Sequence, residues 1–291
     1  MPRSLPRALV VEARPKQWVK NVLVFAAPGA AGIELSHLGP AFAAFGCFCL
    51  AASGTYFLND AADVEADRLH PTKKNRPIAA GEIPLNLARF FGVAAILSSV
   101  GLAALVRWQL AVVIGGYVAM TTVYSLWMKH VAILDVVGVA SGFVLRAIAG
   151  AVAVDVPISD WFFIVASFGS LFMVVGKRRA EAVEMGDEAA SFRPTLGVYP
   201  PSYLAHLQTI ATSVVLVGYC LWAFEKAAAT DASVPWFQIS IIPFSLAILR
   251  YSLLVDTGHG GAPEEVVLGD KTLIVVGALW AAAFAVGVYT T

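Results

Sequence analysis

Three carboxylates and one amide gather between residues 59 and 67, at the end of an apolar stretch. At about 100° per helical residue, Asp60, Asp63 and Asp67 lie within about 60° of one another, and Asn59 lies at the margin of this stripe. Converging carboxylates repel one another unless a positive charge neutralises them. Their oxygen atoms suit Mg²⁺, which also binds phosphate oxygens. The pattern predicts a metal site, and the alternative is a solvated helix end whose acids balance the basic residues that follow.

A basic cluster follows these carboxylates directly along the chain. Lys73, Lys74 and Arg76 carry the positive charges. Cations beside a carboxylate–metal cluster are the arrangement expected for gripping a diphosphate, because the metal bridges some phosphate oxygens and the cations hold others. The alternative is topological, since basic residues collect on the cytoplasmic side of any membrane protein.

A second charged segment begins at residue 177. Lys177 and Arg178 are four and three residues before Glu181, so all three share a helix face. One interpretation is a ladder of intrahelical salt bridges, each worth a few tenths of a kcal/mol. Three consecutive cations at 177–179 exceed what such a ladder requires, which favours a polyanionic ligand.

Further candidate residues lie inside or beside apolar stretches. Arg146 lies deep within one of them, where a charge costs a few kcal/mol unless it is paired or faces a wet cavity. We interpret Arg146 as a phosphate contact, and the alternative is an ion pair with Asp135. Lys16, Lys20 and Asn21 lie at the N-terminal end of the first apolar stretch.

The elements that must position these residues are membrane-spanning helices. Of the 291 residues, 58% are apolar and only 14% are charged, with no net charge. This composition excludes a soluble enzyme and gives no field that would attract nucleic acid. We expect an all-α polytopic protein of nine spans, at 21–35, 40–59, 86–106, 110–128, 132–153, 160–179, 204–225, 235–255 and 271–289.

The distribution of lysine and arginine orients these spans. Basic residues concentrate before the first span and in the long loops 60–85 and 177–203. The positive-inside rule therefore places the N-terminus and both loops in the cytoplasm, and nine spans place the C-terminus outside. We expect one transmembrane domain over 1–291. Shifting the chain by 117 positions places Arg76 on Arg193, a weak sign of internal duplication.

The string FLNDAADVEADRLHPTKKNRPIAAGEIP carries the pattern NDxxDxxxD. It resembles the first aspartate-rich motif of the UbiA superfamily of intramembrane prenyltransferases. This resemblance implies nine transmembrane helices around a central cavity, capped by cytoplasmic loops that hold Mg²⁺ and diphosphate. Ordinary members carry a second motif, DxxxD, after the sixth helix. This chain has KRRAEAVE there, so cations replace metal-binding carboxylates.

That departure marks one branch of the superfamily. Together with RPKQWVKNVLVFAAP, RAIAGAVA, FGSLFMVVGKRRAE and SIIPFSLAILRY, the chain resembles the decaprenyl-phosphate phosphoribosyltransferases over nearly its whole length. The resemblance implies Mg²⁺-dependent transfer of 5-phosphoribose from phosphoribosyl diphosphate to decaprenyl (polyprenyl) phosphate in the plasma membrane, for cell-wall arabinan. Membrane lipid is the other expected partner, and a homo-oligomer is left open.

The resemblance also implies roles for the candidate residues. Asn59, Asp63 and Asp67, with Asp60, would hold Mg²⁺. The residues expected to bind substrate are Lys16, Lys20, Asn21, Tyr56, Lys73, Lys74, Arg76, Arg146, Lys177, Arg178 and Glu181. Two other functions compete: prenyl transfer to an aromatic or lipid acceptor, and lipid transport. Transport is disfavoured because the ionisable clusters lie at the cytoplasmic rim, whereas transport sites lie near the midplane.

Overall fold

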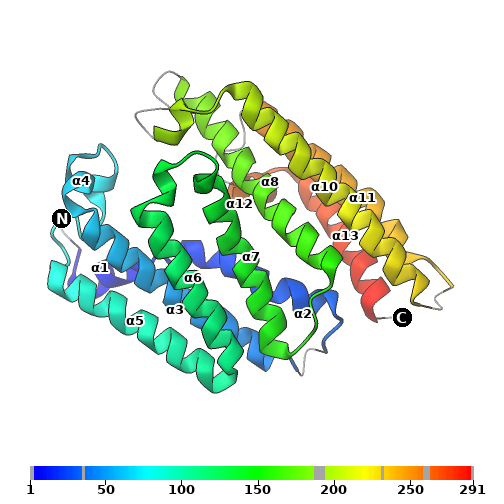
Figure 1. The fold of residues 1–291 in the computed structure, drawn as a ribbon, viewed down its shortest axis with the longest axis horizontal. Helices are drawn as coiled ribbons and strands as arrows, with labels where there is room; N and C mark the ends of the chain where they lie inside the picture. The colour runs from blue at the N-terminus through cyan, green and yellow to red at the C-terminus, as the bar shows by residue number, and fades with distance from the viewer. Residues whose placement is uncertain (1–2, 35–36, 187–193, 231–232, 258–262, 290–291) are drawn as a thin grey trace. The chain divides into compact units, whose positions relative to one another are not determined.

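The computed structural model describes residues 3–34, 37–186, 194–230, 233–257 and 263–289 (Figure 1). These residues form helices and turns, with no strand among them. The chain divides into two compact units. Unit 1 comprises Met1–Gly29, Ile33–Leu126 and Leu145–Pro157, and unit 2 comprises Ala30–Gly32, Trp127–Val144 and Ile158–Thr291. Arg193, which the internal repeat aligns with Arg76, lies outside the described residues.

Within the described ranges, eight helices are long and apolar enough to cross a membrane, and they coincide with eight of the predicted spans. They are α3 (Gly39–Ala62), α5 (Leu85–Val106), α6 (Trp108–Leu126), α7 (Leu134–Val154), α8 (Asp160–Met185), α10 (Pro201–Ala228), α11 (Trp236–Asp256) and α13 (Lys271–Tyr289). The shorter helices are α1 (Leu5–Glu12), η1 (Pro15–Phe25), α2 (Ala26–Ala30), α4 (Val64–Leu69), η3 (Lys73–Asn75), η4 (Met128–His130), η6 (Pro194–Gly197) and α12 (Pro263–Gly269).

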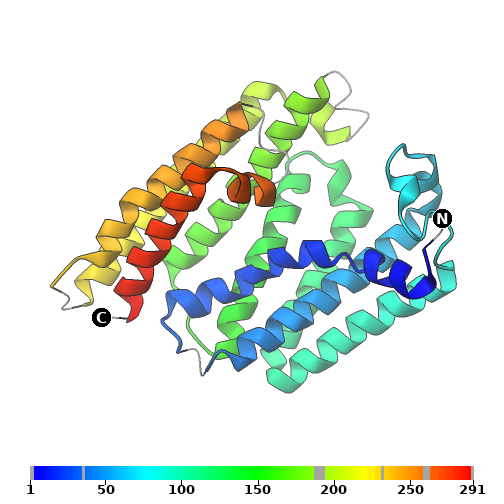
Figure 2. The same cartoon turned by 180° about the vertical axis from the view of Figure 1, so that it is seen from behind.

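The span predicted at 21–35 is not a single α-helix. The 3₁₀ helix η1 begins at Pro15, and α2 continues it only to Ala30, so the predicted count of nine spans is not confirmed. η1 packs along α3 (Figure 2). α7 also approaches η1 so closely that a Cβ atom on Gly150 would lie 1.7 Å from the Val24 carbonyl oxygen. Only glycine fits at that crossing.

The core of unit 1 lies between α3, α5 and α6. Phe48, Leu110 and Ile114 are fully buried in it. α3 and α5 meet at two glycines: a Cβ atom on Gly54 would lie 2.8 Å from the carbonyl oxygen of Gly92. This close approach fixes α3, and with it the carboxylate cluster at the end of α3.

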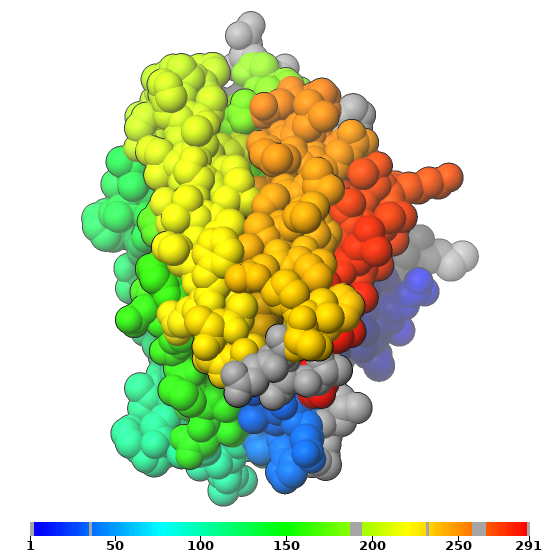
Figure 3. Space-filling model, turned by 90° about the vertical axis from the view of Figure 1, so that its right-hand side faces the viewer, coloured from blue at the N-terminus to red at the C-terminus, as the bar shows by residue number. Residues whose placement is uncertain are grey.

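In unit 2, α8, α10, α11 and α13 pack against one another. Ser159 caps α8 by accepting a hydrogen bond from the Phe162 backbone N–H. α11, in orange beside the yellow α10 in Figure 3, carries a stripe of exposed apolar side chains. They are Ile239, Ile242, Leu246, Leu249 and Leu253. Their spacing of three and four residues forms one helix face, as expected of a surface that faces lipid.

Candidate active site

The end of α3 positions the predicted carboxylates. α3 ends at Ala62, and Asp63 links it to α4 with φ −91° and ψ 9°. The backbone N–H of Asp67 still donates to the Asp63 carbonyl at 2.9 Å, so the turn is retained. Asp60 and Asp67 are buried, at 5% and 3% exposed, whereas Asp63 is exposed. The chain therefore bends at Asp63, and the three carboxylates do not form one stripe on a continuous helix.

Arg76 joins the two buried carboxylates. Its Nη1 lies 3.0 Å from Oδ1 of Asp60 and 2.7 Å from Oδ2 of Asp67. Lys73 and Lys74 lie in the preceding 3₁₀ turn, with Lys74 exposed and Lys73 half-buried. The structure thus brings Arg76 to the carboxylates, as the sequence order alone suggested.

Arg14 is a member of this cluster that sequence reasoning missed. It lies between α1 and η1 with φ 52° and ψ 58°, in the left-handed region. Its guanidinium pairs with Oδ2 of Asp60 and lies over the ring of Tyr56, 4.6 Å from the centroid. The only signal in the sequence was its place at the start of RPKQW.

Glu12 is the second residue that sequence reasoning missed. It is 1% exposed, and no donor in the described structure reaches either of its carboxyl oxygens. Burial, and then the neighbouring Asp60, raise the pKa of Glu12 to about 8, although Arg14 and Arg76 oppose this. The Glu12 carboxyl therefore holds its proton to a higher pH than an exposed glutamate does. No motif marked this residue, which lies at the end of a short apolar helix.

Two side-chain hydrogen bonds fix the N-terminal segment on α3. The indole N–H of Trp18 donates to Oγ of Ser53 at 3.1 Å. The Ser53 hydroxyl in turn donates to the carbonyl of Ala13 at 2.9 Å. Ser53 thereby holds both sides of the Arg14 turn and aims the Arg14 side chain at Asp60.

Arg146 lies inside unit 1, where it contacts an amide, a hydroxyl and two aromatic rings. Its Nε donates to Oδ1 of Asn21 at 2.7 Å, and its Nη2 donates to the Tyr117 hydroxyl at 3.0 Å. The guanidinium also lies over the rings of Phe48 and Tyr117, at 5.6 and 4.8 Å. Asn21 is fully buried and Arg146 is 7% exposed. Of the two lysines predicted near them, Lys16 is exposed and Lys20 is half-buried.

A buried network surrounds Arg178 in unit 2. Asp135, which is fully buried, accepts hydrogen bonds from the hydroxyls of Thr195 at 3.0 Å and Tyr199 at 2.6 Å. Arg178 pairs with Oε2 of Glu181 at 2.6 Å, and its Nε lies 3.6 Å from Asp135. Burial and the Asp135 carboxylate raise the pKa of Tyr199. Asp135 thus has its counter-ion in Arg178, within its own unit.

Lys177 differs from its neighbour Arg178. Its side chain is 42% exposed, and its Nζ lies 4.0 Å from Oε1 of Glu181. Arg179 donates to Gln208 at 2.7 Å and pairs with Asp256. Of the three consecutive cations, Lys177 therefore has the most exposed side chain, and Arg178 is enclosed by the network.

The oxygen donors at the end of α3 match Mg²⁺ in chemistry. Asn59, Asp60, Asp63 and Asp67 supply amide and carboxylate oxygens, the ligands that this ion prefers. In the described part of the chain, however, no group of three or more His, Cys, Asp or Glu residues is arranged to hold a metal ion. Guanidinium groups neutralise Asp60 and Asp67 in this arrangement.

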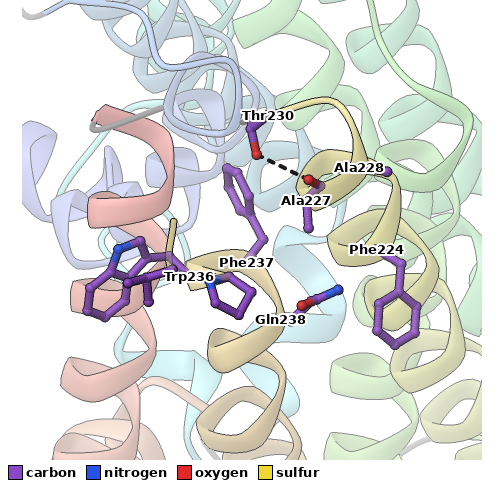
Figure 4. Close-up of a pocket in the computed structure, with 9 residues that line it drawn as sticks. Phe224, Ala227, Ala228, Thr230, Trp236, Phe237 and Gln238 are labelled. Atoms are coloured by element: carbon purple, nitrogen blue, oxygen red, sulfur yellow. Dashed lines mark hydrogen bonds between the residues drawn. The ribbon is translucent and has the colours of Figure 1, made fainter. Parts of the chain in front are cut away.

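A separate pocket of about 210 Å³ lies where α10 and α11 are joined (Figure 4). Its lining includes Phe224, Trp236, Phe237 and Gln238. None of the candidate residues contributes to it, and none of its lining residues is charged. We assign it no part in the chemistry.

Comparison with known proteins bears on this arrangement. The model of the UbiA prenyltransferase family matches residues 22–275. A protein of Corynebacterium glutamicum named decaprenyl-phosphate phosphoribosyltransferase is 46% identical over 99% of this chain and 89% of its own length. A protein of the same name from Mycolicibacterium smegmatis is 43% identical, over 99% and 94%. The structure of a UbiA homologue from Archaeoglobus fulgidus, bound to GPP and Mg²⁺, superposes with a TM-score of 0.72 at 18% identity, covering 98% of this chain and 100% of the homologue.

Proposed function

Because the chain belongs to the UbiA prenyltransferase family and is a multi-pass membrane transferase, we propose that it transfers 5-phosphoribose from phosphoribosyl diphosphate to a polyprenyl phosphate such as decaprenyl phosphate. One observation carries the substrate assignment: relatives named for this reaction are 43–46% identical over nearly the whole chain. The likeness to solved structures supports the fold alone, because its identity is below 20%.

The carboxylate cluster is proposed to bind Mg²⁺. Asn59, Asp63 and Asp67, with Asp60 beside them, would hold the ion. When bound, Mg²⁺ supplies positive charge that neutralises the diphosphate leaving group. Asp63 supports this proposal by its exposure at the bend between α3 and α4, where a ligand can reach it.

The cations are proposed to bind the phosphate groups of the donor. Lys73, Lys74 and Arg76 would hold the diphosphate together with the metal. Lys177 would contact the second phosphate of the donor, at C5 of the ribose, because a carboxylate at that position would repel it. The 42% exposure of the Lys177 side chain supports this role, and the enclosed Arg178 would support Lys177 through their shared partner Glu181.

The reaction then needs no general base, because the lipid phosphate is already anionic at pH 7. One of its oxygens attacks C1 of the ribose, the bond from C1 to the diphosphate oxygen breaks, and the electron pair leaves with diphosphate. Attack from the opposite face inverts C1. The protein contributes alignment and charge stabilisation. Arg146, Lys16 and Lys20 are proposed to hold the acceptor phosphate. Arg146 donates hydrogen bonds to two neutral acceptors, the Asn21 amide oxygen and the Tyr117 hydroxyl.

The biological setting follows from the same proposal. The product would be a precursor of the arabinose donor for cell-wall arabinan, made in the plasma membrane. The basic loops would place the N-terminus, the Asp60–Asp67 cluster and Lys177 on the cytoplasmic side, where phosphoribosyl diphosphate is available.

The proposal is tested by adding labelled phosphoribosyl diphosphate and decaprenyl phosphate to the purified protein in detergent. We expect labelled lipid to form with Mg²⁺ and not with a chelator. A parallel reaction offers a prenyl diphosphate and an aromatic acceptor. Product only in the parallel reaction would assign the chain to prenyl transfer, and binding of polyprenyl phosphate without turnover in either would indicate a carrier.

A further inference from the structure

Arg14 has an unfavourable backbone conformation. At φ 52° and ψ 58° it is one of three non-glycine residues with positive φ in the described structure. The left-handed region is unfavourable for such a residue, because its Cβ atom comes too close to the following carbonyl oxygen. Pro15 follows it, and the residue before a proline ordinarily adopts an extended conformation. Strain of this kind persists only where surrounding contacts enforce it, and it gathers at ligand sites.

The side chain of Arg14 is held but not enclosed. It pairs with Asp60 and lies over Tyr56, and both of these residues lie on one face of α3, four positions apart. The Arg14 side chain is 27% exposed, whereas that of Asp60 is 6% exposed. The guanidinium can therefore leave the carboxylate toward solvent while it stays near the aromatic ring.

Asp60 is the carboxylate on which the positive charges converge. Arg14 contacts one of its oxygens, and Arg76 contacts the other at 3.0 Å. A metal ion that approaches Asp60 or its neighbours meets these two guanidinium groups, which repel it.

We propose that Arg14 is a donor-binding residue that exchanges partners: it neutralises Asp60 while the site is empty, and it moves to the diphosphate oxygens of the donor when Mg²⁺ takes over the carboxylates. Planar guanidinium groups bind phosphate through two parallel hydrogen bonds, so the new partner is at least as favourable as the old one. This inference rests on the proposed function for the identity of the donor. It also implies that Mg²⁺ and diphosphate bind cooperatively.

A purely structural role for Arg14 gives a different expectation. If Arg14 only fastened the N-terminal segment to α3, its loss would weaken the binding of every ligand together. Partner exchange predicts that loss of Arg14 strengthens the binding of Mg²⁺ and weakens the binding of diphosphate. The guanidinium competes with Mg²⁺ for the carboxylates, whereas it contacts diphosphate directly. The substitution Arg14→Asn suits this test, since asparagine tolerates the left-handed region. Arg14→Lys keeps the charge without the planar fork.

The experiment is calorimetric titration of the full-length protein in detergent. Mg²⁺ alone is titrated first, and inorganic diphosphate is then titrated at saturating Mg²⁺. For Arg14→Asn we expect the Kd for Mg²⁺ to fall about tenfold and the Kd for diphosphate to rise about tenfold to a hundredfold, as for the loss of one charge-assisted contact. Arg14→Lys should leave the Kd for Mg²⁺ near that of the wild type. Arg107→Gln, which breaks the pair with Asp155 in the same unit, should change neither.

Three outcomes would overturn the proposal. They are weaker binding of both ligands by Arg14→Asn, an unchanged Kd for Mg²⁺, and no Mg²⁺ binding to either protein. A thermal melt of Arg14→Asn shows whether this variant still folds. The Arg14→Lys variant provides a second test at the same position. Because neither probe carries ribose, the opposite shifts would support partner exchange even if the donor proved to be a prenyl diphosphate.

Discussion

The two charged clusters differ in how completely their members are satisfied. In unit 2, Asp135 accepts two hydroxyl hydrogen bonds and has Arg178 as its counter-ion, and Arg178 also pairs with Glu181. In unit 1, Arg14 and Arg76 form ion pairs with the buried carboxylates of Asp60 and Asp67. The backbone of Arg14 is strained, and no hydrogen-bond donor in the described structure reaches the Glu12 carboxyl oxygens. The first network is closed except at Nε of Arg178, which lies 3.6 Å from Asp135 and has no hydrogen-bond partner in the described structure, and the second is open.

This difference separates structural charges from charges that await a ligand. A nearly closed network of buried charges is costly to break and gives little to a substrate, because most of its partners are already engaged. An open cluster keeps unsatisfied groups that a ligand can complete. We therefore expect substitutions in unit 1 to act mainly on turnover and those around Arg178 to act mainly on stability.

The largest effect is expected for Asp67→Asn. The substitution removes a carboxylate charge on which cation affinity depends, so transfer of labelled phosphoribose should fall below detection while the protein still inserts into membranes. Asp63→Asn should behave in the same way. Glu65→Gln on the same helix changes an acid whose side chain is 81% exposed and should keep normal activity. An active Asp67→Asn variant at ordinary Mg²⁺ would contradict the metal assignment.

Asp135→Asn tests the closed network. The variant leaves a buried arginine with one counter-ion fewer, at a cost of about 3 kcal/mol or more. The melting temperature in detergent should fall by roughly 5–10 °C. The control is Asp155→Asn, which breaks the ion pair with Arg107 at a side chain that is 79% exposed and should lower the melting temperature by at most about 1–2 °C. If both variants lowered the melting temperature equally, the cluster around Arg178 would not be the structural network described above.

Lys177→Ala sharpens the comparison, because this exposed cation lies beside the closed network without being enclosed by it. We expect the KM for phosphoribosyl diphosphate to rise by about one to two orders of magnitude, the loss of one charge-assisted contact. The KM for polyprenyl phosphate should change much less. Steady-state transfer with each substrate varied separately gives both values. If only the KM for polyprenyl phosphate rose, Lys177 would belong to the acceptor site.

The smallest effect is expected for Glu12→Gln. The pKa of Glu12 is about 8 in the folded protein against an ordinary 4.5, so the folded protein binds a proton that the unfolded chain has lost. The free energy of unfolding must then decline as the pH rises from about 4.5 to about 8. Glutamine cannot ionise, so the variant should melt several degrees above the wild type at pH 8 and alike at pH 4.5. The melting temperatures of the wild type and the variant are measured across this pH range without Mg²⁺. If the difference between them did not change with pH, Glu12 would be ionised throughout.

Much of the fold could be predicted because it depends on local apolar runs. The predicted span 271–289 coincides with α13, and the span 86–106 differs from α5 by one residue. The first span was wrong in form, because an apolar run does not distinguish a 3₁₀ helix from an α-helix. The bend at Asp63 was also unforeseen, since an ideal helix was assumed beyond α3.

The candidate site was predicted only where its residues are near one another in the chain. Asp60, Asp67 and Arg76 lie within one motif, and the structure joins them. Arg14 is 46 residues from its partner Asp60, and Tyr199 is 64 residues from Asp135. Contacts between residues so far apart in the sequence depend on how the helices pack. The spacing of residues along the chain does not predict this packing.

The 3₁₀ form of η1 has a consequence for how far a short segment reaches. A 3₁₀ helix rises about 2.0 Å per residue against about 1.5 Å in an α-helix. The 11 residues of η1 and the five of α2 together extend about 30 Å, the thickness of the hydrocarbon layer. Sixteen residues could thus cross the bilayer where an α-helix would need about 20. A reporter fused after Thr291 would then lie outside the cell.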